Sequence, residues 1–218
     1  MTGIAAPLLQ ARAWVGERDG RLLWGPLDVC LHPGDALHVQ GPNGCGKTTL
    51  LRTLAGLRPP AAAAHTQLCA DTWWVGHASA LADELDAARN LALLLAVAGA
   101  PPLPAARVQA HLAAQGVPLG QPVRLLSAGQ RRKLALAPLG LVARALWLLD
   151  EPFDALDAAA CAALADLAAQ HVARGGAIVL TSHQPLPALF PAHQILHLSL
   201  PDARKQLLNQ EQSKGLSA

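Results

Sequence analysis

The chain has 218 residues, of which 17 are Lys or Arg and 15 are Asp or Glu, so its formal net charge is +2. Charged residues make up 15% of the sequence and apolar residues 52%, a balance that excludes an intrinsically disordered chain. The small net charge gives no support to nucleic-acid binding through bulk positive charge, so no nucleic-acid partner is expected. Aromatic residues are scarce, with five Trp, two Phe and no Tyr.

The longest apolar stretch begins at Leu91 and reads LALLLAVAGA, after which Pro101 and Pro102 interrupt it. A membrane-spanning helix needs about 20 consecutive apolar residues, so this stretch is too short to span. The N-terminus lacks the basic start of a secretory signal. The cysteines form no CxxC pair and have no metal-ligand spacing. We therefore expect a chain in a reducing cytoplasm that does not cross a membrane by itself.

Apolar runs bounded by Gly and Pro alternate with longer helical patterns, which predicts an α/β fold around a largely parallel sheet. The residues after position 200 are polar and are expected to form a loose tail or a frayed helix. In chain order the expected elements are a strand (Ala36–Gln40), a helix (49–57), a strand (73–75), a mostly helical insertion with proline breaks (81–123), a strand (145–149), an Ala-rich helix (Ala158–Ala173) and a strand (Ala177–Thr181).

Residues 41–48, GPNGCGKT, match the pattern GxxxxGK[ST] at every fixed position. Glycines let the backbone wrap closely around oxygen atoms, and a following helix directs its positive end at them. In such a loop Lys47 reaches the β and γ phosphates, and the Thr48 hydroxyl binds Mg²⁺. A chance glycine-rich loop is the alternative, but a strand precedes this one and a helix follows it. The sequence therefore predicts a site for ATP and Mg²⁺ made by Gly41, Pro42, Asn43, Gly44, Cys45, Gly46, Lys47, Thr48 and Thr49.

The apolar run 146–149 ends in two carboxylates, Asp150 and Glu151. Downstream of a phosphate loop, Asp150 would hold Mg²⁺ through water, and Glu151 would act as the general base that polarises the attacking water. A helix N-cap would explain an acidic pair at a strand end equally well. The phosphate loop upstream favours the catalytic interpretation.

Four further motifs follow GPNGCGKTT in order: LSAGQ at 126–130, LLDEP at 148–152, ALD at 155–157 and TSHQ at 181–184. This ordered set covers nearly the whole chain and resembles the nucleotide-binding subunits of ABC transporters. The resemblance implies a P-loop NTPase (ABC ATPase) core with a mainly parallel sheet, a small N-terminal antiparallel β part and a short helical subdomain at about 81–125. It also implies that residues 1–200 form a single ATP-binding domain and 201–218 a polar tail.

The resemblance further implies a head-to-tail homodimer, with each ATP held between the phosphate loop of one chain and LSAGQ of the other. Ser127 and Gly129 would touch the γ phosphate across the interface, and Gln130 belongs to the same nucleotide-binding set. Gly129, just before a helix, fits this through its exposed backbone N–H. An ordinary serine-capped helix start is the alternative. His183 would contact the γ phosphate and position Glu151 and water, as a second catalytic residue.

Residues 76–77 read Gly-His where most of these ATPases carry a Gln that links Mg²⁺ to the membrane partner. With LSAGQ in place of the commoner LSGGQ, and with the short length, this resembles the ATP-binding subunits of cytochrome c biogenesis systems (haem exporter type). His77 could therefore stand in for the Gln as a neutral imidazole near the metal. A polar residue at a strand end is the alternative.

This narrower resemblance implies a motor subunit that couples ATP-driven dimer closure to haem export, or to release of haem from its carrier. Its expected place is the cytoplasmic face of the bacterial inner membrane, as a peripheral subunit. Its expected partners are integral membrane permease subunits and, indirectly, haem-handling proteins. The ATPase subunit of another small-substrate ABC transporter and a non-hydrolysing ATP-sensing scaffold are the alternatives.

Three features depart from the family pattern. The first strand normally ends in an aromatic residue that stacks on adenine, but Glu17 or Arg18 falls near that point, and Trp14 is the nearest aromatic residue. Pro138 lies in the helix after LSAGQ, where an interior proline costs about 3 kcal/mol, so we expect that helix to end or kink there. Cys45 occupies a variable position of the phosphate loop, and both a redox role and a tolerated small residue are open.

Overall fold

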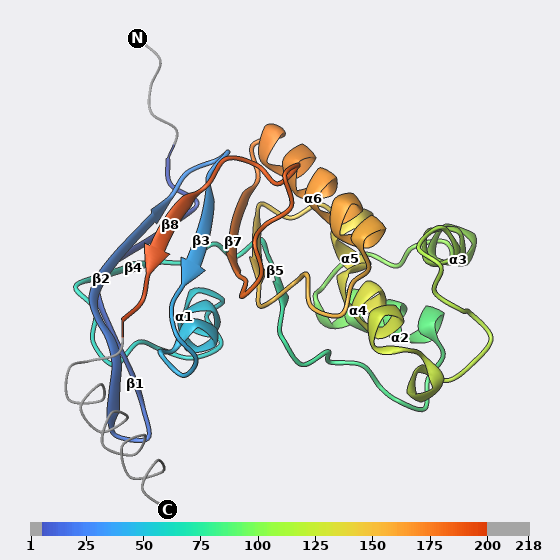
Figure 1. Cartoon of the computed structure of the whole chain (residues 1–218), viewed down its shortest axis with the longest axis horizontal. Coiled ribbons are helices and arrows are strands. Elements are labelled where there is room, and N and C mark those ends of the chain that lie inside the picture. Colours follow the sequence, from blue (N-terminus) through green and yellow to red (C-terminus); the bar gives the residue numbers. More distant parts are fainter. Residues whose placement is uncertain (1–5, 200–218) are drawn as a thin grey trace, which may run out of the picture.

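The computed structural model describes residues 6–199 (Figure 1). At its centre lies a five-stranded sheet in the order β5-β6-β7-β3-β8, and every neighbouring pair runs parallel. This confirms the predicted α/β fold with a mainly parallel sheet. The pattern did not predict β8, whose residues are mostly exposed. The strands are β3 (Ala36–Gln40), β5 (Thr72–Val75), β6 (Leu146–Leu149), β7 (Ala177–Thr181) and β8 (Gln194–His197).

A second, antiparallel sheet is built by β1 (Leu9–Arg18), β2 (Arg21–Leu31) and β4 (His65–Gln67), with β1 in the middle. Strands β1 and β2 form a hairpin whose turn residues, Asp19 and Gly20, have φ of 53° and 73°. Positive φ at both central residues is what a tight type I′ hairpin turn requires, and Asp-Gly supplies it. The expected N-terminal antiparallel part is therefore present.

Helix α1 (Lys47–Leu54) lies between the two sheets (Figure 1). Its residues Leu50, Leu51 and Leu54 are fully buried in a core that also takes in β1 and β6. The predicted helix, 49–57, started two residues late and ran three residues too far. The chain leaves the helix before Gly56, whose φ of 70° is the left-handed conformation that often ends helices.

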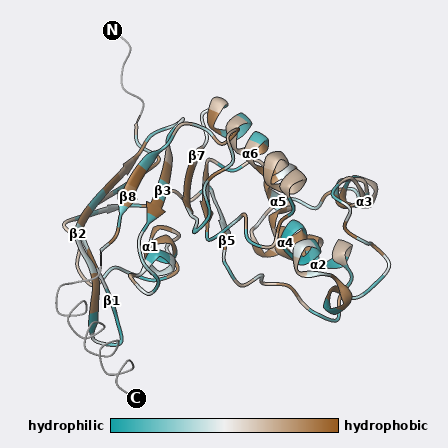
Figure 2. Ribbon diagram, in the orientation of Figure 1, coloured by the Kyte–Doolittle hydropathy of each residue, from teal (hydrophilic) through white to brown (hydrophobic). Residues whose placement is uncertain are grey.

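The parallel sheet carries a core on each face, because alternate residues of a strand point to opposite sides. On β6, Leu146 and Leu148 belong to the core around α1, while Trp147 and Leu149 belong to the other core. Figure 2 shows hydrophobic residues along β7 and over much of the Ala-rich helix α6. The helices that contribute to the second core are α2 (Ala87–Val97), α3 (Ala105–Ala114), α4 (Ala128–Leu136), α5 (Pro138–Leu141) and α6 (Ala158–Ala173), with a 3-10 turn η1 (Val123–Leu125) before α4.

The helix that follows LSAGQ ends where Pro138 stands. Helix α4 stops at Leu136, and α5 begins with Pro138 as its first residue. Proline is tolerated at a first helical position because that N–H has no partner within the helix. The prediction that Pro138 ends or kinks this helix is confirmed.

Within residues 6–199, no helix combines the length and apolarity that crossing a bilayer would require. The polar tail expected at 201–218 lies outside the described residues.

Candidate functional site

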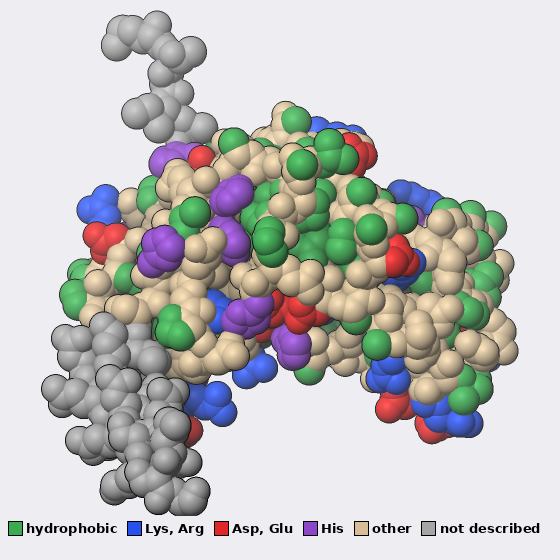
Figure 3. Space-filling view, viewed as in Figure 1, with side chains coloured by type: hydrophobic (Ala, Val, Ile, Leu, Met, Phe, Trp, Pro, Cys, Tyr) green, Lys and Arg blue, Asp and Glu red, His purple; other side chains and the backbone are tan. Residues whose placement is uncertain are grey.

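The carboxyl ends of β3, β6 and β7 meet at one edge of the parallel sheet, beside the start of α1 (Figure 1). A cavity of about 350 Å³ opens at this edge. Figure 3 shows histidine and acidic side chains gathered near the middle of the same face. The predicted site residues that line the cavity are Asn43, Gly44, Gly46, Lys47, Thr48, Thr49, His77, Asp150, Glu151 and His183.

The loop between β3 and α1 depends on glycines that adopt positive φ. The φ angles are 151° at Gly41, 75° at Gly44 and 101° at Gly46, values that L side chains rarely adopt. A Cβ on Gly46 would also lie 2.8 Å from the Trp24 ring, which packs behind the loop. The glycines therefore allow the close wrapping that the sequence pattern predicts.

Lys47 is 8% exposed and still lines the cavity. Its Nζ donates hydrogen bonds to the carbonyl oxygens of Gly41 (2.8 Å) and Pro42 (3.3 Å). A cation is thus held at the floor of the cavity by backbone oxygens, where an anionic ligand could replace them. Cys45 is fully buried, lies outside the cavity lining and packs with Leu50 in the core beneath the loop.

Two hydroxyl groups hold Asp150 from either side. Thr48 Oγ1 donates to Asp150 Oδ2 and Thr181 Oγ1 donates to Asp150 Oδ1, each at 2.8 Å. A hydroxyl and a carboxylate that converge in this way are hard oxygen ligands of the kind that Mg²⁺ prefers. Among residues 6–199 no cluster of three or more His, Cys, Asp or Glu could hold a metal ion. The pair therefore suits Mg²⁺ that shares its remaining ligands with water and a phosphorylated substrate.

Glu151 is 6% exposed and has a φ of 51°, a left-handed conformation that is strained for a non-glycine residue. Its N–H donates to Thr181 Oγ1 at 2.9 Å. Glu151 Oε2 accepts the backbone N–H of His183 at 2.9 Å, and Glu151 Oε1 lies 3.3 Å from His183 Nε2. The strained backbone thus brings the carboxylate against the imidazole at the cavity.

The side chain of Arg132, in α4, donates hydrogen bonds to backbone carbonyl groups at this edge of the sheet. The sequence pattern predicted no role for it. It is 5% exposed and donates to the carbonyl oxygens of Asp150 and Glu151, both at 2.8 Å, and of Gly76 at 2.9 Å and Pro152 at 3.3 Å. Burial lowers the pKa of the guanidinium, and nearby carboxylates, Asp154 first among them, oppose that shift. Arg132 thus joins α4 to the ends of β5 and β6.

His77 lines the cavity, and its side chain is 67% exposed. Its Nδ1 is 3.8 Å from Asp154 Oδ2, and no hydrogen bond of the imidazole to Asp150 or Thr48 is present. His77 therefore sits at the predicted site without a direct bond to the predicted metal ligands.

The residues of LSAGQ do not line this cavity. Ser127 is exposed, and its Oγ accepts the N–H of Gln130 at 3.2 Å while Gln130 Oε1 accepts the N–H of Ser127 at 2.9 Å. This capping box starts α4, as the alternative interpretation expected. A Cβ on Gly129 would lie 2.8 Å from the carbonyl oxygen of Ala155, so glycine allows α4 to approach the ALD segment.

The aromatic residue nearest the end of β1 cannot stack on a base. Trp14 is fully buried, and its Nε1 donates to His65 O (3.0 Å) and Thr66 Oγ1 (2.9 Å). At the hairpin end of the cavity the lining residues are Arg18 and Leu23.

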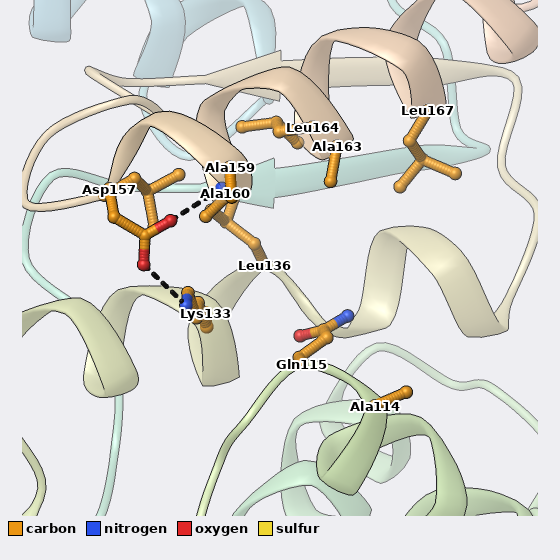
Figure 4. A pocket seen from close by; sticks show the side chains of 11 residues that line it. Ala114, Gln115, Lys133, Leu136, Asp157, Ala159, Ala160, Ala163, Leu164 and Leu167 are labelled. Carbon is orange, nitrogen blue, oxygen red and sulfur yellow. Dashed lines mark hydrogen bonds and ion pairs between the residues drawn. The ribbon is translucent and has the colours of Figure 1, made fainter.

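A second cavity, of about 400 Å³, lies between the end of α3, helix α4 and helix α6 (Figure 4). At one side Lys133 Nζ lies 3.0 Å from Asp157 Oδ2. The N–H of Ala160 and the ammonium group of Lys133 hold the pKa of the Asp157 carboxyl below its usual value. The rest of the lining is mainly Ala and Leu, and among the predicted site residues none lines it.

The sequence model of the ABC transporter family matches residues 25–154. The fold, the phosphate loop and this match define the class: the chain belongs to the ABC transporter family and is an ATPase of that family. Two similar solved structures agree with the fold. One is a putative ABC transporter ATP-binding protein from Pyrococcus furiosus, with a TM-score of 0.72 and 19% identity over 87% of this chain and 96% of that one. The other is a dimeric ATP-binding cassette bound to ADP and Pi, with a TM-score of 0.74 and 17% identity over 88% and 96% of the two chains.

Within the family, the chain is an ATP-binding protein of the CcmA type. It is 42% identical over 210 residues to the cytochrome c biogenesis ATP-binding export protein CcmA of Pseudomonas syringae pv. syringae, covering 89% of this chain and 96% of that protein. It is 43% identical over 192 residues to the protein of the same name from Salmonella typhi, covering 83% and 91%.

Proposed function

We propose that the chain hydrolyses ATP as the motor subunit of a membrane complex for cytochrome c biogenesis. One observation carries the hydrolytic part. Glu151 and His183 meet at a cavity that also contains Lys47 and the Thr48–Asp150 pair. A base, an anion-binding cation and a pair of hard oxygen ligands are the parts that phosphoryl transfer to water requires.

In this proposal the triphosphate lies along the loop 41–46, whose backbone N–H groups and the N-terminus of α1 face the phosphates. Lys47 exchanges its carbonyl partners for the β and γ phosphate oxygens. Thr48 and Asp150 would hold Mg²⁺, with His77 also in the cavity lining, and the ion would supply positive charge beside the phosphates. The Thr181 hydroxyl keeps Asp150 oriented from the other side.

Glu151 accepts a proton from a water molecule as the water oxygen bonds to the γ phosphorus. The bond from that phosphorus to the β–γ bridging oxygen breaks, and the electron pair leaves with ADP. His183 keeps the Glu151 carboxylate turned toward the water and contacts the γ phosphate. The products are ADP and inorganic phosphate.

The second half of each site comes, in this proposal, from another copy of the chain. Ser127 is exposed at the start of α4, and Gly129 and Gln130 follow it outside the cavity. A head-to-tail homodimer would bring Ser127, Gly129 and Gln130 of one copy to the phosphates held by the other. Closing that dimer around two ATP molecules, and opening it after hydrolysis, is the proposed source of motion.

The relatives named CcmA support the finer assignment to cytochrome c biogenesis. The chain would act as a peripheral subunit at the cytoplasmic face of the bacterial inner membrane, bound to integral membrane permease subunits. The motion would drive haem export or release of haem from a membrane-bound carrier, with haem-handling proteins as indirect partners. The near-neutral charge supports the absence of a nucleic-acid partner.

The test is a deletion of the gene in its own host, followed by haem staining of c-type cytochromes. The proposal expects their loss, recovery with the wild-type chain, and no recovery with Lys47→Ala expressed at the same level. Unchanged c-type cytochromes after deletion would contradict the assignment to this process. Full recovery by Lys47→Ala would contradict a role for ATP.

A further inference from the structure

The cavity at the sheet edge does not stop at the phosphate loop. It continues to the β1–β2 hairpin, where Arg18 and Leu23 line it. Another hollow, of about 450 Å³, is lined by the same two residues and by Asp19 and Arg21. If the triphosphate lies between Lys47 and Asp150, the sugar and base must extend away from the carboxylates. Among the lining residues, Arg18 and Leu23 of the hairpin belong neither to the phosphate loop nor to the segments that carry the carboxylates.

No tryptophan or phenylalanine ring lines this cavity, and all seven such residues lie within the described part of the chain. Trp24, the ring nearest the loop, is 4% exposed and turned away. Its Nε1 donates to Gly46 O at 3.3 Å, and its ring fills the space where Cβ atoms on Gly16 and Gly46 would stand. The ring therefore supports the loop from behind and leaves no flat apolar face for a base.

We propose that the nucleobase rests on the guanidinium plane of Arg18 and the side chain of Leu23, so that the site takes purine nucleoside triphosphates with little choice between adenine and guanine. The inference rests on the proposed ATPase function and names its substrate class more broadly. The guanidinium group of Arg18 is charged and planar, and the side chain is 67% exposed. Leu23 is 5% exposed and presents an apolar surface beside it.

The lack of base selection follows from the kind of contact. A guanidinium plane stacks on any base, because every base has a π face. Strong discrimination needs buried polar groups that are left unpaired by the wrong base. The polar side chains that line the hollow at the hairpin end are Arg18, Asp19 and Arg21, and all three are exposed, so water can pair with them whichever base is bound.

The first experiment compares kcat/KM of the full chain for ATP and GTP. The proposal expects the two values to agree within about tenfold, since exposed groups discriminate weakly. A preference for ATP above about a hundredfold would overturn the inference and leave the proposed ATPase function intact. Failure to hydrolyse either nucleotide would instead contradict the proposed function itself.

The second experiment asks whether Arg18 contacts the base or only attracts phosphates. Binding of ATP, GTP and inorganic tripolyphosphate is measured by calorimetry on the full chain carrying Glu151→Gln, so that hydrolysis is slow on the timescale of the measurement. Arg18→Ala should weaken ATP and GTP about tenfold each and leave tripolyphosphate unchanged, because tripolyphosphate has no base. Arg18→Trp should keep the affinity for both nucleotides, and Arg18→Lys should not.

Arg12→Ala is the matched control, because it removes the same charge from the same strand at an exposed position outside the cavity lining. It should leave all three affinities unchanged. Equal weakening of tripolyphosphate and nucleotides by Arg18→Ala, with rescue by Arg18→Lys, would overturn the base contact.

Discussion

The edge of the parallel sheet and the start of α4 both carry predicted nucleotide-binding residues, but they are built in different ways. At the sheet edge, Asp150 and Glu151 are almost fully buried, and their hydrogen bonds close on other residues of the same site. At the start of α4, Ser127 is exposed, and its hydrogen bonds close on Gln130 one turn away. The first region is held together by hydrogen bonds within one chain. The second region is a helix N-terminus whose capping hydrogen bonds are complete. It contacts nothing in the cavity, as expected of a surface that another copy would cover.

The largest expected effect comes from replacing the proposed general base of the buried region, Glu151. Glu151→Gln keeps the size of the side chain but removes the negative oxygen that would take a proton. Turnover should fall roughly 10²–10⁴-fold, the usual contribution of a general base, while ATP affinity is kept. Single-turnover phosphate release and equilibrium ATP binding measure the two quantities. Normal hydrolysis by the variant would refute the assignment of the base.

Arg132→Lys should have the next largest effect, because it removes the fork that joins α4 to the sheet edge. Lysine keeps the charge but cannot reproduce the donor geometry toward four carbonyl groups. We expect the free energy of unfolding to fall by about 3 kcal/mol and kcat to fall by up to about tenfold, with a smaller change in KM. Arg131→Lys is the neighbouring control, since Arg131 is only half-buried. Equal effects of the two substitutions would contradict the special place of Arg132.

Thr181→Val tests the same region more gently. Valine has nearly the same shape, but it removes the hydroxyl group, which donates to Asp150 and accepts from the backbone N–H of Glu151. The buried N–H is then unpaired, at a cost of about 1–3 kcal/mol, and kcat should fall about tenfold. Thr181→Ser should retain most of the activity. Thermal unfolding and steady-state kinetics together separate loss of stability from loss of orientation.

The smallest expected effect is the pH dependence of stability. Burial lowers the pKa of His38, His111 and His171 below 6.5, so the folded state favours the neutral imidazole. The unfolded chain takes up protons first as the pH falls. The stability from these groups is therefore complete above about pH 6.5 and is lost as the pH falls toward the lowered values. Calorimetry at pH 7.5 and 5.5 should show a lower Tm at pH 5.5, and His171→Gln should reduce that difference.

Local patterns predicted the fold well where one residue type decides the structure. Strand β7 and helix α6 have the predicted bounds, because an apolar run and an Ala-rich run are each limited by sharp breaks. Pro138 ends α4 for a reason that needs no tertiary information. The start of α1 was predicted two residues late, since only the loop geometry shows that the helix opens at Lys47.

The site was predicted less completely, because two of its residues act through contacts that sequence spacing does not reveal. Thr181 is the last residue of a buried strand, and only pairing of β7 with β6 brings its hydroxyl to Asp150. Arg132 stands in a run of three basic residues, 131–133, for which the sequence predicted no role, whereas the fold buries it beneath the sheet edge. The one signal in the sequence that Arg132 is buried was its position as a charged residue before the apolar face of a helix.

The central claim is that each site needs the buried region of one chain and the exposed region of another. The most direct test mixes two inactive full-length variants, Lys47→Ala and Ser127→Arg, and measures ATP hydrolysis. In a head-to-tail dimer, random mixing of equal amounts leaves roughly a quarter of the sites with an intact Lys47 and an intact Ser127, so activity should return to about that fraction of wild type. No recovery, with both variants folded and mixed dimers demonstrated, would contradict the account.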